Sequence, residues 1–324
     1  MRVLVLHSDV GADAPADEQD TLITARAIVE ALRERGYQVS SAAFEPEPAA
    51  LGIVIENAHP DLIFNLVESV HGDGFLAAMA PAMLDKLGVC YTGAGATCIA
   101  LTADKVLSKR VLRAAGLPTA DWSESPDWAG LKSEQLYIVK SVTEDASLGL
   151  DDDAVVSGGA VPARAQTSRS RHSGRWFAEA YLEGREFNVA ILEAAQGIHV
   201  LPMPEMRFEA WAEDRPRIVG YAAKWDEASD DAVKTVRVFG VEEDEPALAR
   251  QLEELAYSAW DLFGMRGYAR IDFRIDAGGT PMILEANPNP CLEPQAGFAA
   301  AASRAGLSYA DLVEHIARGA YRAP

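Results

Sequence analysis

The segment TPMILEANPNP, residues 280–290, decides the fold that we expect for this chain. Residues 281–284 are apolar and typical of a buried β-strand, yet the strand ends in Glu285 and Asn287. Side chains two positions apart in a strand lie on the same face of the sheet. A buried strand therefore carries a carboxylate and a carboxamide side by side, and this pair needs a chemical reason.

The segment YARIDFRID, residues 268–276, precedes that strand across an Ala-Gly-Gly turn. Its polar and apolar residues alternate, so Arg270 and Asp272 share one face. If the two strands pair, Asp272, Glu285 and Asn287 converge as three oxygen ligands. Mg²⁺ takes one or two carboxylates and completes its shell with phosphate oxygens and water, so this set predicts a magnesium site. The alternative is a solvent-exposed hairpin face, which the rigid Asn-Pro-Asn-Pro loop disfavours.

The first hundred residues alternate between strand and helix patterns. Such alternation indicates parallel strands with helices on both faces, an α/β arrangement. The expected strands are residues 3–7, 37–44, 61–67 and 89–93. The expected helices are residues 21–35 and 76–87.

The pattern changes after a strong helix expected at residues 103–115. Strands with little helix between them indicate a mostly antiparallel sheet, and hence an α+β region. These strands are expected at residues 137–142, 176–181, 186–192 and 199–202. A helix at residues 246–263, the hairpin and two short helices complete the pattern.

Composition excludes several classes of partner. The net charge of −20 and the pI of about 4.7 oppose binding to nucleic acid or to an anionic membrane. No apolar run approaches the roughly 18 residues that span a bilayer. The three cysteines, Cys90, Cys98 and Cys291, form no C-x-x-C pair, and an odd count suits a reducing compartment. We therefore expect a cytoplasmic protein with no nucleic-acid and no membrane partner.

Five segments, taken in order, carry a family resemblance. They are GVCYTGAGATCIALTADKVLSKRVLRAAGLPT (88–119), YIVKSVTEDASLG (137–149), FAEAYLEGREFNVAIL (177–192), YAAKWD (221–226), and RIDF followed by ILEANPNP. Together they resemble the ATP-grasp ligases, and specifically the D-alanine–D-alanine ligase-like branch. The resemblance runs from about residue 60 to the end of the sequence.

The resemblance implies an ATP-grasp fold, which combines α/β and α+β parts. We expect an N-terminal parallel, Rossmann-like domain at residues 1–102 and a small central α+β subdomain at residues 103–184. A C-terminal antiparallel-sheet domain is expected at residues 185–324. A chain of 324 residues with 49% hydrophobic content is long enough for such a division.

The resemblance also assigns roles around the hairpin. Asp272, Glu285 and Asn287 would hold Mg²⁺ on ATP. A second metal ion is also expected, and Mn²⁺ is expected to substitute for Mg²⁺. Arg270 would stabilise negative charge on the reacting carbonyl. Lys224 would follow the γ-phosphate and precede a polar lid that excludes water. For Arg270 the alternative is a salt bridge to Asp272 or Asp276.

Further residues match the family's nucleotide site. Lys105 and Lys140 resemble its phosphate lysines, and Ser147 lies in the small-residue phosphate loop. An adenine-binding hinge and a carboxylate that accepts from the ribose hydroxyls complete the match. These last residues are Glu179, Ala180 and Leu182 for the hinge, and Glu186 for the ribose. The alternatives are a surface lysine at Lys105, a plain turn at 144–149, and exposed strand residues at Glu179 and Glu186.

The reaction implied by the resemblance joins a small carboxylate to an amine through an acylphosphate, with ADP released. One alternative is a true D-alanine–D-alanine ligase of cell-wall precursor synthesis. Another is an ATP-binding protein without catalysis, which the intact ligand set disfavours. A carboxylase or an acyl-CoA-forming ligase is a third, although no biotin or CoA signal is visible. A homodimer is a further expectation.

The chain departs from the dipeptide ligases on the substrate side. Residues 8–20 lack their Gly-Gly-x-Ser-x-Glu segment, and Ala146 replaces a serine in the phosphate loop. Glu293, in the sequence CLEPQ, adds negative charge where those ligases bind the second substrate's carboxylate. Glu68 and His71 are weaker substrate candidates, since they follow a first-domain strand, and for His71 the alternative is a turn. We therefore expect an enzyme that is not chiefly a D-alanine–D-alanine ligase.

Overall fold

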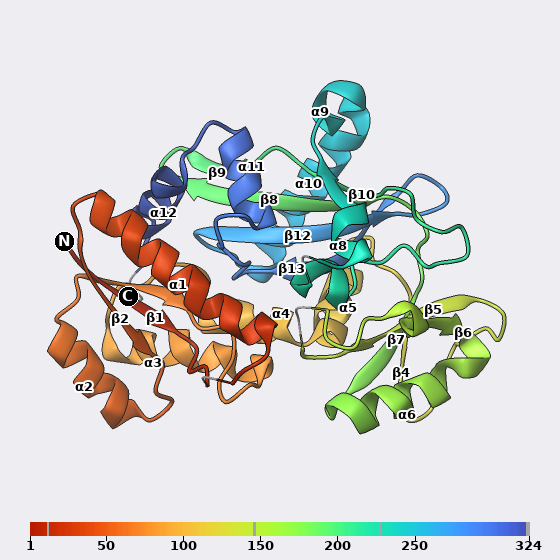
Figure 1. Cartoon of the computed structure of the whole chain (residues 1–324), viewed down its shortest axis with the longest axis horizontal. Helices are drawn as coiled ribbons and strands as arrows, with labels where there is room; N and C mark the ends of the chain where they lie inside the picture. Colours follow the sequence, from red (N-terminus) through yellow and green to blue (C-terminus); the bar gives the residue numbers. More distant parts are fainter. Residues whose placement is uncertain (12, 145–146, 227, 322–324) are drawn as a thin grey trace.

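The computed structural model of the chain describes residues 1–11, 13–144, 147–226 and 228–321 (Figure 1). Its strands form three sheets of three, six and four strands. Within the described residues, no helix is long and apolar enough to cross a membrane. The expected division into three domains at residues 102 and 184 stays a prediction.

The first sheet is parallel, as the alternating pattern predicted. Strand β1 (Arg2–His7) lies between β2 (Gln38–Ala43) and β3 (Leu62–Leu66). Both neighbours run parallel to β1, with Val3 opposite Val39 and Leu62. The carboxyl ends of these strands lead into the loops that reach the cleft described below.

Helices cover both faces of this sheet. Helix α1 (Ala16–Glu34) and helix α12 (Tyr309–Arg318) pack on one face, and α2 (Pro48–Ala58) and α3 (Met79–Leu87) pack on the other (Figure 1). The alternation of side chains along a strand explains this division. The side facing α1 and α12 contributes Val3, Val5, Leu62 and Phe64, and the opposite side contributes Leu4, Leu6 and Ile63.

One expectation for this region is wrong. The segment 89–93 is not a strand, because Tyr91 forms only isolated bridges to Ile63 and Tyr321 before the chain turns at a glycine of positive φ. The helix expected at residues 103–115 is present over residues 105–114, and a separate helix that the sequence analysis did not predict ends just before it. Asp104 has an extended backbone, and its side chain accepts from the N–H of Leu107 at 2.8 Å, which begins a new helix.

These helices have the following bounds. The first is α4 (Ala96–Ala103), and α5 (Lys105–Ala114) begins directly after the capping residue. A 3₁₀ turn, η1 (Gly74–Ala78), precedes α3 in the segment that the sequence presented as one helix.

The second sheet is antiparallel, with strand order β4-β7-β5-β6. Helix α6 (Val161–His172), which the sequence analysis missed, covers one face of it. The helix is mostly polar and buries only one narrow stripe, so its apolar period is weak. The strands are β4 (Trp122–Glu124), β5 (Leu136–Ser141), β6 (Val155–Ser157) and β7 (Trp176–Ala180), with short turns η2 (Asp152–Ala154) and η3 (Gly158–Ala160).

The third sheet has the order β11-β10-β8-β12-β13, with β9 beside β8. Helix α10 (Pro246–Phe263) has the bounds that the sequence predicted, and it packs on the apolar face of β8 and β12. The strands are β8 (Glu186–Ala194), β9 (Gly197–Val200), β10 (Glu205–Phe208), β11 (Thr235–Val238), β12 (Tyr268–Ile275) and β13 (Pro281–Asn287).

One apolar core joins the first and third sheets. Leu192 of β8 and Tyr268 of β12 belong to the same buried cluster as the residues of α1 and α12. Helix α11 (Gly297–Arg304) contributes Phe298, whose ring meets Tyr268 edge to face at 5.8 Å. The final helices therefore fix the hairpin strands against the N-terminal sheet.

The hinge between β7 and β8 lies directly against β12 at Gly184. A Cβ placed on Gly184 would collide with the carbonyl oxygen of Ile275, which is backbone and cannot swing away. We predict that Gly184→Ala lowers the free energy of unfolding by about 1–3 kcal/mol, because overpacking forces the two backbones apart. Urea unfolding followed by circular dichroism measures this change.

Gly52 provides the matched control for this substitution. It lies inside α2, and a Cβ there would meet nothing within 4 Å. Gly52→Ala should therefore stabilise the chain by about 0.5–1 kcal/mol through helix propensity. Equal effects of the two substitutions would contradict the close packing of the hinge on β12.

Candidate active site

The hairpin pairs as the sequence predicted. Asp272 lies opposite Glu285, and Arg270 lies opposite Asn287, so these four side chains share one face of β12 and β13. The register then shifts by one residue, with Phe273 opposite Ile283. This bulge leaves Leu284 without a cross-strand partner.

The bulge lets β13 bury Ile283 in the core while Glu285 faces the cleft. Strict alternation would place Ile283 on the same face as the metal-ligand candidates. With the register shift, Ile283 and Ala286 are both buried in the core under α10, while Glu285 and Leu284 line the cleft. The sequence carried no signal for this bulge.

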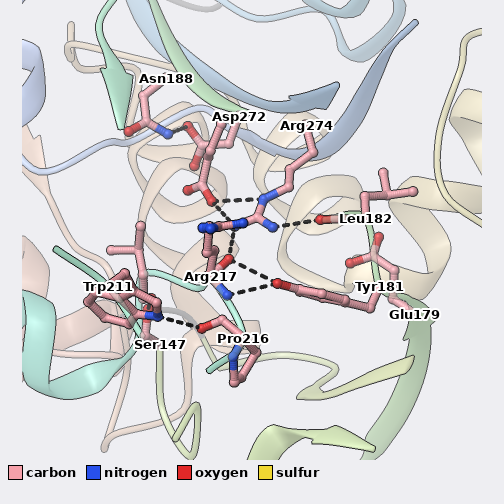
Figure 2. A network of polar contacts seen from close by, with 12 residues as sticks. Ser147, Glu179, Tyr181, Leu182, Asn188, Trp211, Pro216, Arg217, Asp272 and Arg274 are labelled. Atoms are coloured by element: carbon pink, nitrogen blue, oxygen red, sulfur yellow. Dashed lines mark hydrogen bonds and ion pairs between the residues drawn. The ribbon is translucent and has the colours of Figure 1, made fainter. Parts of the chain in front are cut away.

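Arg270 is tied to Asp272 by two hydrogen bonds. Its Nε and one terminal nitrogen each donate to a different carboxylate oxygen at 2.8 Å. Asn188 of β8 lies opposite Asp272 and donates to the same carboxylate from Nδ2 at 2.9 Å (Figure 2). The sequence analysis missed Asn188, although its position two residues after Glu186 places it on the same face. The salt-bridge alternative for Arg270 is thus present, which orients both side chains.

The cleft is electropositive around Glu285. Burial opposes the charged form of Glu285, but Lys105 and Arg270, together with Lys224 and Lys140, outweigh it and hold the pKa of that carboxyl below its usual range. The pKa of Lys224 is lowered, first by the protein atoms crowded around it, although its side chain is still exposed to solvent, and then by Arg270. The site therefore holds an ionised carboxylate ready for a cation, next to ammonium groups suited to phosphate.

The oxygen donors fit one Mg²⁺ ion with phosphate as a further ligand. Asp272 and Glu285 supply the two carboxylates and Asn287 supplies an amide oxygen, which matches the preference of Mg²⁺ for few protein ligands. Across the described ranges, no group of three or more His, Cys, Asp or Glu side chains could hold a metal ion. The metal assignment of these three residues stays a prediction.

Lys140 and Glu179 form a buried ion pair at the back of the cleft. Lys140 Nζ donates to Glu179 Oε2 at 2.6 Å, and the fully buried Lys109 pairs with Oε1 of the same carboxylate. Lys109 also donates to Thr119 at 2.8 Å. Burial disfavours the charged carboxyl, yet the two ammonium groups lower the pKa of Glu179. Sequence reasoning missed Lys109, because a lysine on an amphipathic helix gives no sign of burial.

The predicted hinge connects β7 to β8. Ala180 ends β7, Leu182 follows it, and Glu186 begins β8. All three line the cleft, as does Tyr181 between them. Tyr181 accepts from the N–H of Arg217 through its hydroxyl at 2.8 Å, which holds a loop over the hinge (Figure 2).

The phosphate-loop candidates lie at the edge of the described ranges. Lys105, the first residue of α5, donates from Nζ to the carbonyl oxygen of Glu144 at 2.9 Å. Ser147 has a φ of 63° and donates from Oγ to the carbonyl of Val219 at 2.8 Å. The expectation for Ala146 lies outside the described residues.

The lid is expected at residues 226–236, after Lys224, and it stays a prediction. It contains α8 (Asp230–Lys234) and follows α7 (Tyr221–Trp225), and residue 227 lies outside the described ranges. Arg215 donates to both oxygens of Asp231, at 2.7 and 2.8 Å, which fixes α8. Lys224 lies on α7 and lines the cleft.

The cleft has a volume of about 1020 Å³ and is lined by residues from all three sheets and their loops. Glu68 and Glu293 are in its wall. His71 is exposed at the tip of a tight turn with a φ of 53°, and the described lining residues do not include it. His71 thus occupies the turn that the sequence analysis named as the alternative.

Helix α1 brings acidic residues of the N-terminal segment to the cleft. Asp17, Glu18 and Asp20 at its start all line the cleft. Asp17 accepts from the hydroxyl of Tyr221 at 3.0 Å, and Asp20 accepts from the thiol of Cys291 at 2.9 Å. Carboxylates are therefore present at this end of the cleft, although the sequence motif itself is absent.

The three sheets and their connections define the ATP-grasp fold. A crystal structure of D-alanine–D-alanine ligase from Bacillus anthracis complexed with ATP matches 98% of this chain and 97% of that chain. The TM-score is 0.74 at 19% sequence identity. The expected fold class is thereby confirmed.

Sequence comparison gives the family. The family model described as D-ala D-ala ligase C-terminus matches residues 111–318, and the chain belongs to this family. It is an ADP-forming, ATP-dependent carboxylate–amine ligase of the D-alanine–D-alanine ligase-like type. The expectation of an enzyme is confirmed over that of a binding protein without catalysis.

Curated relatives cover most of the chain. An uncharacterised protein, y4sG, of Sinorhizobium fredii is 31% identical over 81% of this chain and 75% of its own length. The D-alanine–D-alanine ligase of Albidiferax ferrireducens is 28% identical over 95% of this chain and 84% of its own length. That of Moorella thermoacetica is 29% identical over 93% of this chain and 95% of its own length.

Glu179 should make stability depend on pH. Its pKa in the folded chain lies below the ordinary value of 4.5, so its contribution is present above that value and is lost as the pH falls through the folded pKa. We predict that Glu179→Gln costs about 3–5 kcal/mol at pH 7, because the substitution leaves two ammonium groups without their counter-charge. The cost should shrink as the pH falls below 4.5.

Urea unfolding at a series of pH values measures this dependence. The exposed Glu134 supplies a control, since Glu134→Gln should change stability little at any pH. A difference between wild type and Glu179→Gln that stays constant with pH would contradict the assignment of an ionised, ion-paired Glu179.

Proposed function

We propose that the chain phosphorylates a substrate carboxylate with ATP and then transfers the acyl group to an amine. A carboxylate oxygen attacks the γ-phosphorus, the bond to the β-phosphate oxygen breaks, and ADP leaves. The amine nitrogen then attacks the acyl carbon and loses a proton, and the bond to phosphate breaks. The supporting observation is the register that sets Asp272 opposite Glu285 in the wall of the cleft.

Mg²⁺ fits the donor set at this register. Asp272, Glu285 and Asn287 would hold it, and when bound it neutralises charge on the transferring phosphoryl group. A second ion, and Mn²⁺ in place of Mg²⁺, belong to the same proposal. Asn188 and Arg270 keep the Asp272 carboxylate in one orientation through their hydrogen bonds.

The ammonium groups of the cleft position the triphosphate. Lys140 and Lys105 carry the charge that offsets the β- and α-phosphates, and Ser147 belongs to the loop that covers them. Lys224, on the short helix α7, faces the transferring phosphate. Its lowered pKa rises again when phosphate oxygens approach, because opposite charge favours the ammonium form.

The hinge recognises the nucleoside in this proposal. The backbone at Ala180 and Leu182 reads the adenine edge, with Glu179 behind it, and Glu186 accepts from the ribose hydroxyls. Arg270 stabilises negative charge on the reacting carbonyl. Its electrostatic interactions with Glu285 and Lys224 support a role for Arg270 close to the reacting groups.

The substrates are a small carboxylic acid and a small amine. The names of several relatives favour D-alanine for both. Glu293 in the cleft wall favours instead an acceptor without an α-carboxylate, since like charges repel. Glu68 and the carboxylates of α1 are suited to an ammonium group on either substrate. His71 stays a weak candidate, because the structure places it in an exposed turn.

The cytoplasmic location and the homodimer both stay predictions. All three cysteines are free thiols, which supports the reducing compartment and cytoplasmic location expected from sequence. A homodimer is proposed on sequence expectation alone.

We predict that Asp272→Asn and Glu285→Gln each abolish ADP formation, by at least about 10³-fold, while the chain stays folded. Each substitution removes one charge from the proposed Mg²⁺ site and keeps the size of the side chain. ADP release with a panel of carboxylic acids and amines measures activity, and circular dichroism checks the fold.

Asp276→Asn is the matched control on the same hairpin. Asp276 accepts from the N–H groups of Gly278 and Thr280 in the turn and is not a ligand candidate. It should keep near-normal turnover. Near-normal turnover of either ligand variant, with Mg²⁺ present, would refute the metal assignment.

We predict that D-alanine does not give the highest kcat/KM as the amine acceptor. Glu293→Gln should raise kcat/KM for carboxylate-bearing acceptors several-fold, because it removes the repulsion and keeps the side-chain volume. Steady-state kinetics with D-alanine beside a panel of amino acids and amines tests both statements. If D-alanine is the best acceptor and D-alanyl-D-alanine is the product, the chain is instead a true D-alanine–D-alanine ligase.

A further inference from the structure

Arg274 is a buried charge that none of the proposed catalytic roles uses. It lies on β12 two residues after Asp272 and directly opposite Glu186 of β8. Its exposed fraction is only 4%. Burying a guanidinium is costly unless its donors are satisfied, so its partners indicate what it holds in place.

The donors of Arg274 reach three separate segments. Nε and one terminal nitrogen donate to Glu186 Oε2 at 3.1 and 2.9 Å. The other terminal nitrogen, Nη1, donates to the carbonyl oxygen of Leu182 at 2.6 Å. Nη2, the terminal nitrogen that bonds to Glu186, also donates to the carbonyl oxygen of Arg217 (Figure 2). The guanidinium carbon lies 5.7 Å from the ring centroid of Tyr181 and 6.0 Å from that of Phe208.

These contacts act on the hinge and on the carboxylate proposed for the ribose. Both hydrogen bonds to Glu186 end on Oε2, and among the described residues none donates to Oε1. Oε1 is therefore the oxygen left to accept from a ligand in the cleft that Glu186 lines. The bond to Leu182 fixes the backbone of the hinge at the same time.

The third contact fastens a loop over the hinge. Residues 216–219, which we name the cover loop, precede α7. Tyr181 bonds to both the N–H and the carbonyl of Arg217, at 2.8 and 3.4 Å. Ile218 and Val219 of the cover loop line the cleft. One side chain thus ties the hinge, the Glu186 carboxylate and the cover loop together.

We propose that Arg274 is the positioning residue that gives this enzyme its selectivity for the ribose hydroxyls of ATP, by holding Glu186 in its accepting orientation. The inference rests on the proposed function, in which Glu186 accepts from the ribose. Only a guanidinium has donors spread widely enough for three acceptors, and a lysine ammonium is a single point of charge. Without Arg274 the carboxylate loses both its counter-charge and its fixed rotamer.

The test compares the binding of ATP and 2′,3′-dideoxy-ATP, which lacks both ribose hydroxyls. Calorimetric titration in the presence of Mg²⁺ gives the Kd of each nucleotide without needing the other substrates. We expect wild type to bind ATP about 10- to 100-fold more tightly than the dideoxy compound, as for hydrogen bonds to a charged acceptor. Arg274→Met should reduce that ratio to below about 3.

Three further variants separate positioning from general stability. Arg274→Lys should give an intermediate ratio, and Glu186→Gln should reduce the ratio as Arg274→Met does. Adding Arg274→Met to Glu186→Gln should change the ratio no further, because both substitutions remove one interaction. This comparison also serves if Arg274→Met alone folds poorly.

Arg185→Met is the matched control. Arg185 makes a similar two-point ion pair with Glu205 in the same sheet, at 2.9 Å through each nitrogen, but is not among the described cleft residues. Arg185→Met should lower thermal stability and leave the ratio of the two nucleotide Kd values unchanged. A wild-type ratio kept in Arg274→Met, or lost equally in Arg185→Met, would overturn the inference alone. Failure of wild type to bind ATP at all would instead refute the proposed function and this inference with it.

Discussion

Strand β12 must satisfy two opposite environments, and the rest of the structure depends on how it does so. One face, with Ile271 and Phe273, is buried under α10, while the other presents Arg270, Asp272 and Arg274 to the cleft. The two-residue period of a strand separates these faces without any change in backbone. Pairing with β8 and β13 then adds Asn188, Glu186 and Glu285 to the polar face at fixed distances. The candidate site is thus built on paired strands of one sheet, where packing on the other face holds each side chain in position.

The distribution of charge fits the nucleotide and metal that we propose for the cleft. The chain carries 49 acidic and 29 basic residues, yet the residues around Glu285 are mostly cationic. A triphosphate with its metal needs positive charge on one side and carboxylates on the other, and low accessibility strengthens both. Several of these charges are held by fixed partners, such as Arg270 by Asp272 and Lys140 by Glu179. Such pairing keeps each group oriented and lowers the cost of burying it.

Some features were readable from the sequence because they depend on local patterns. The hairpin around the Gly-Gly turn, helix α10 and the parallel first sheet each follow from periodicity over a few residues. Helix α6 and helix α4 were not readable in the same way. A polar helix with one narrow buried stripe has little apolar period, and the eight residues of α4 are too short an apolar run to show a helical period.

By itself the sequence determined the family, through five segments in the correct order, and it predicted a metal and phosphate site at Asp272, Glu285 and Asn287, which stays a prediction. Only the tertiary structure decided what surrounds these residues. Examples are the bulge at Leu284, the buried Lys109, and Arg274 with its three acceptors. It also brought the carboxylates of α1 to the cleft, more than two hundred residues away from the Cys291 thiol that Asp20 contacts. The physical reason is that a side chain's charge and shape are local properties. Burial and partners depend on which distant segments the fold packs around it.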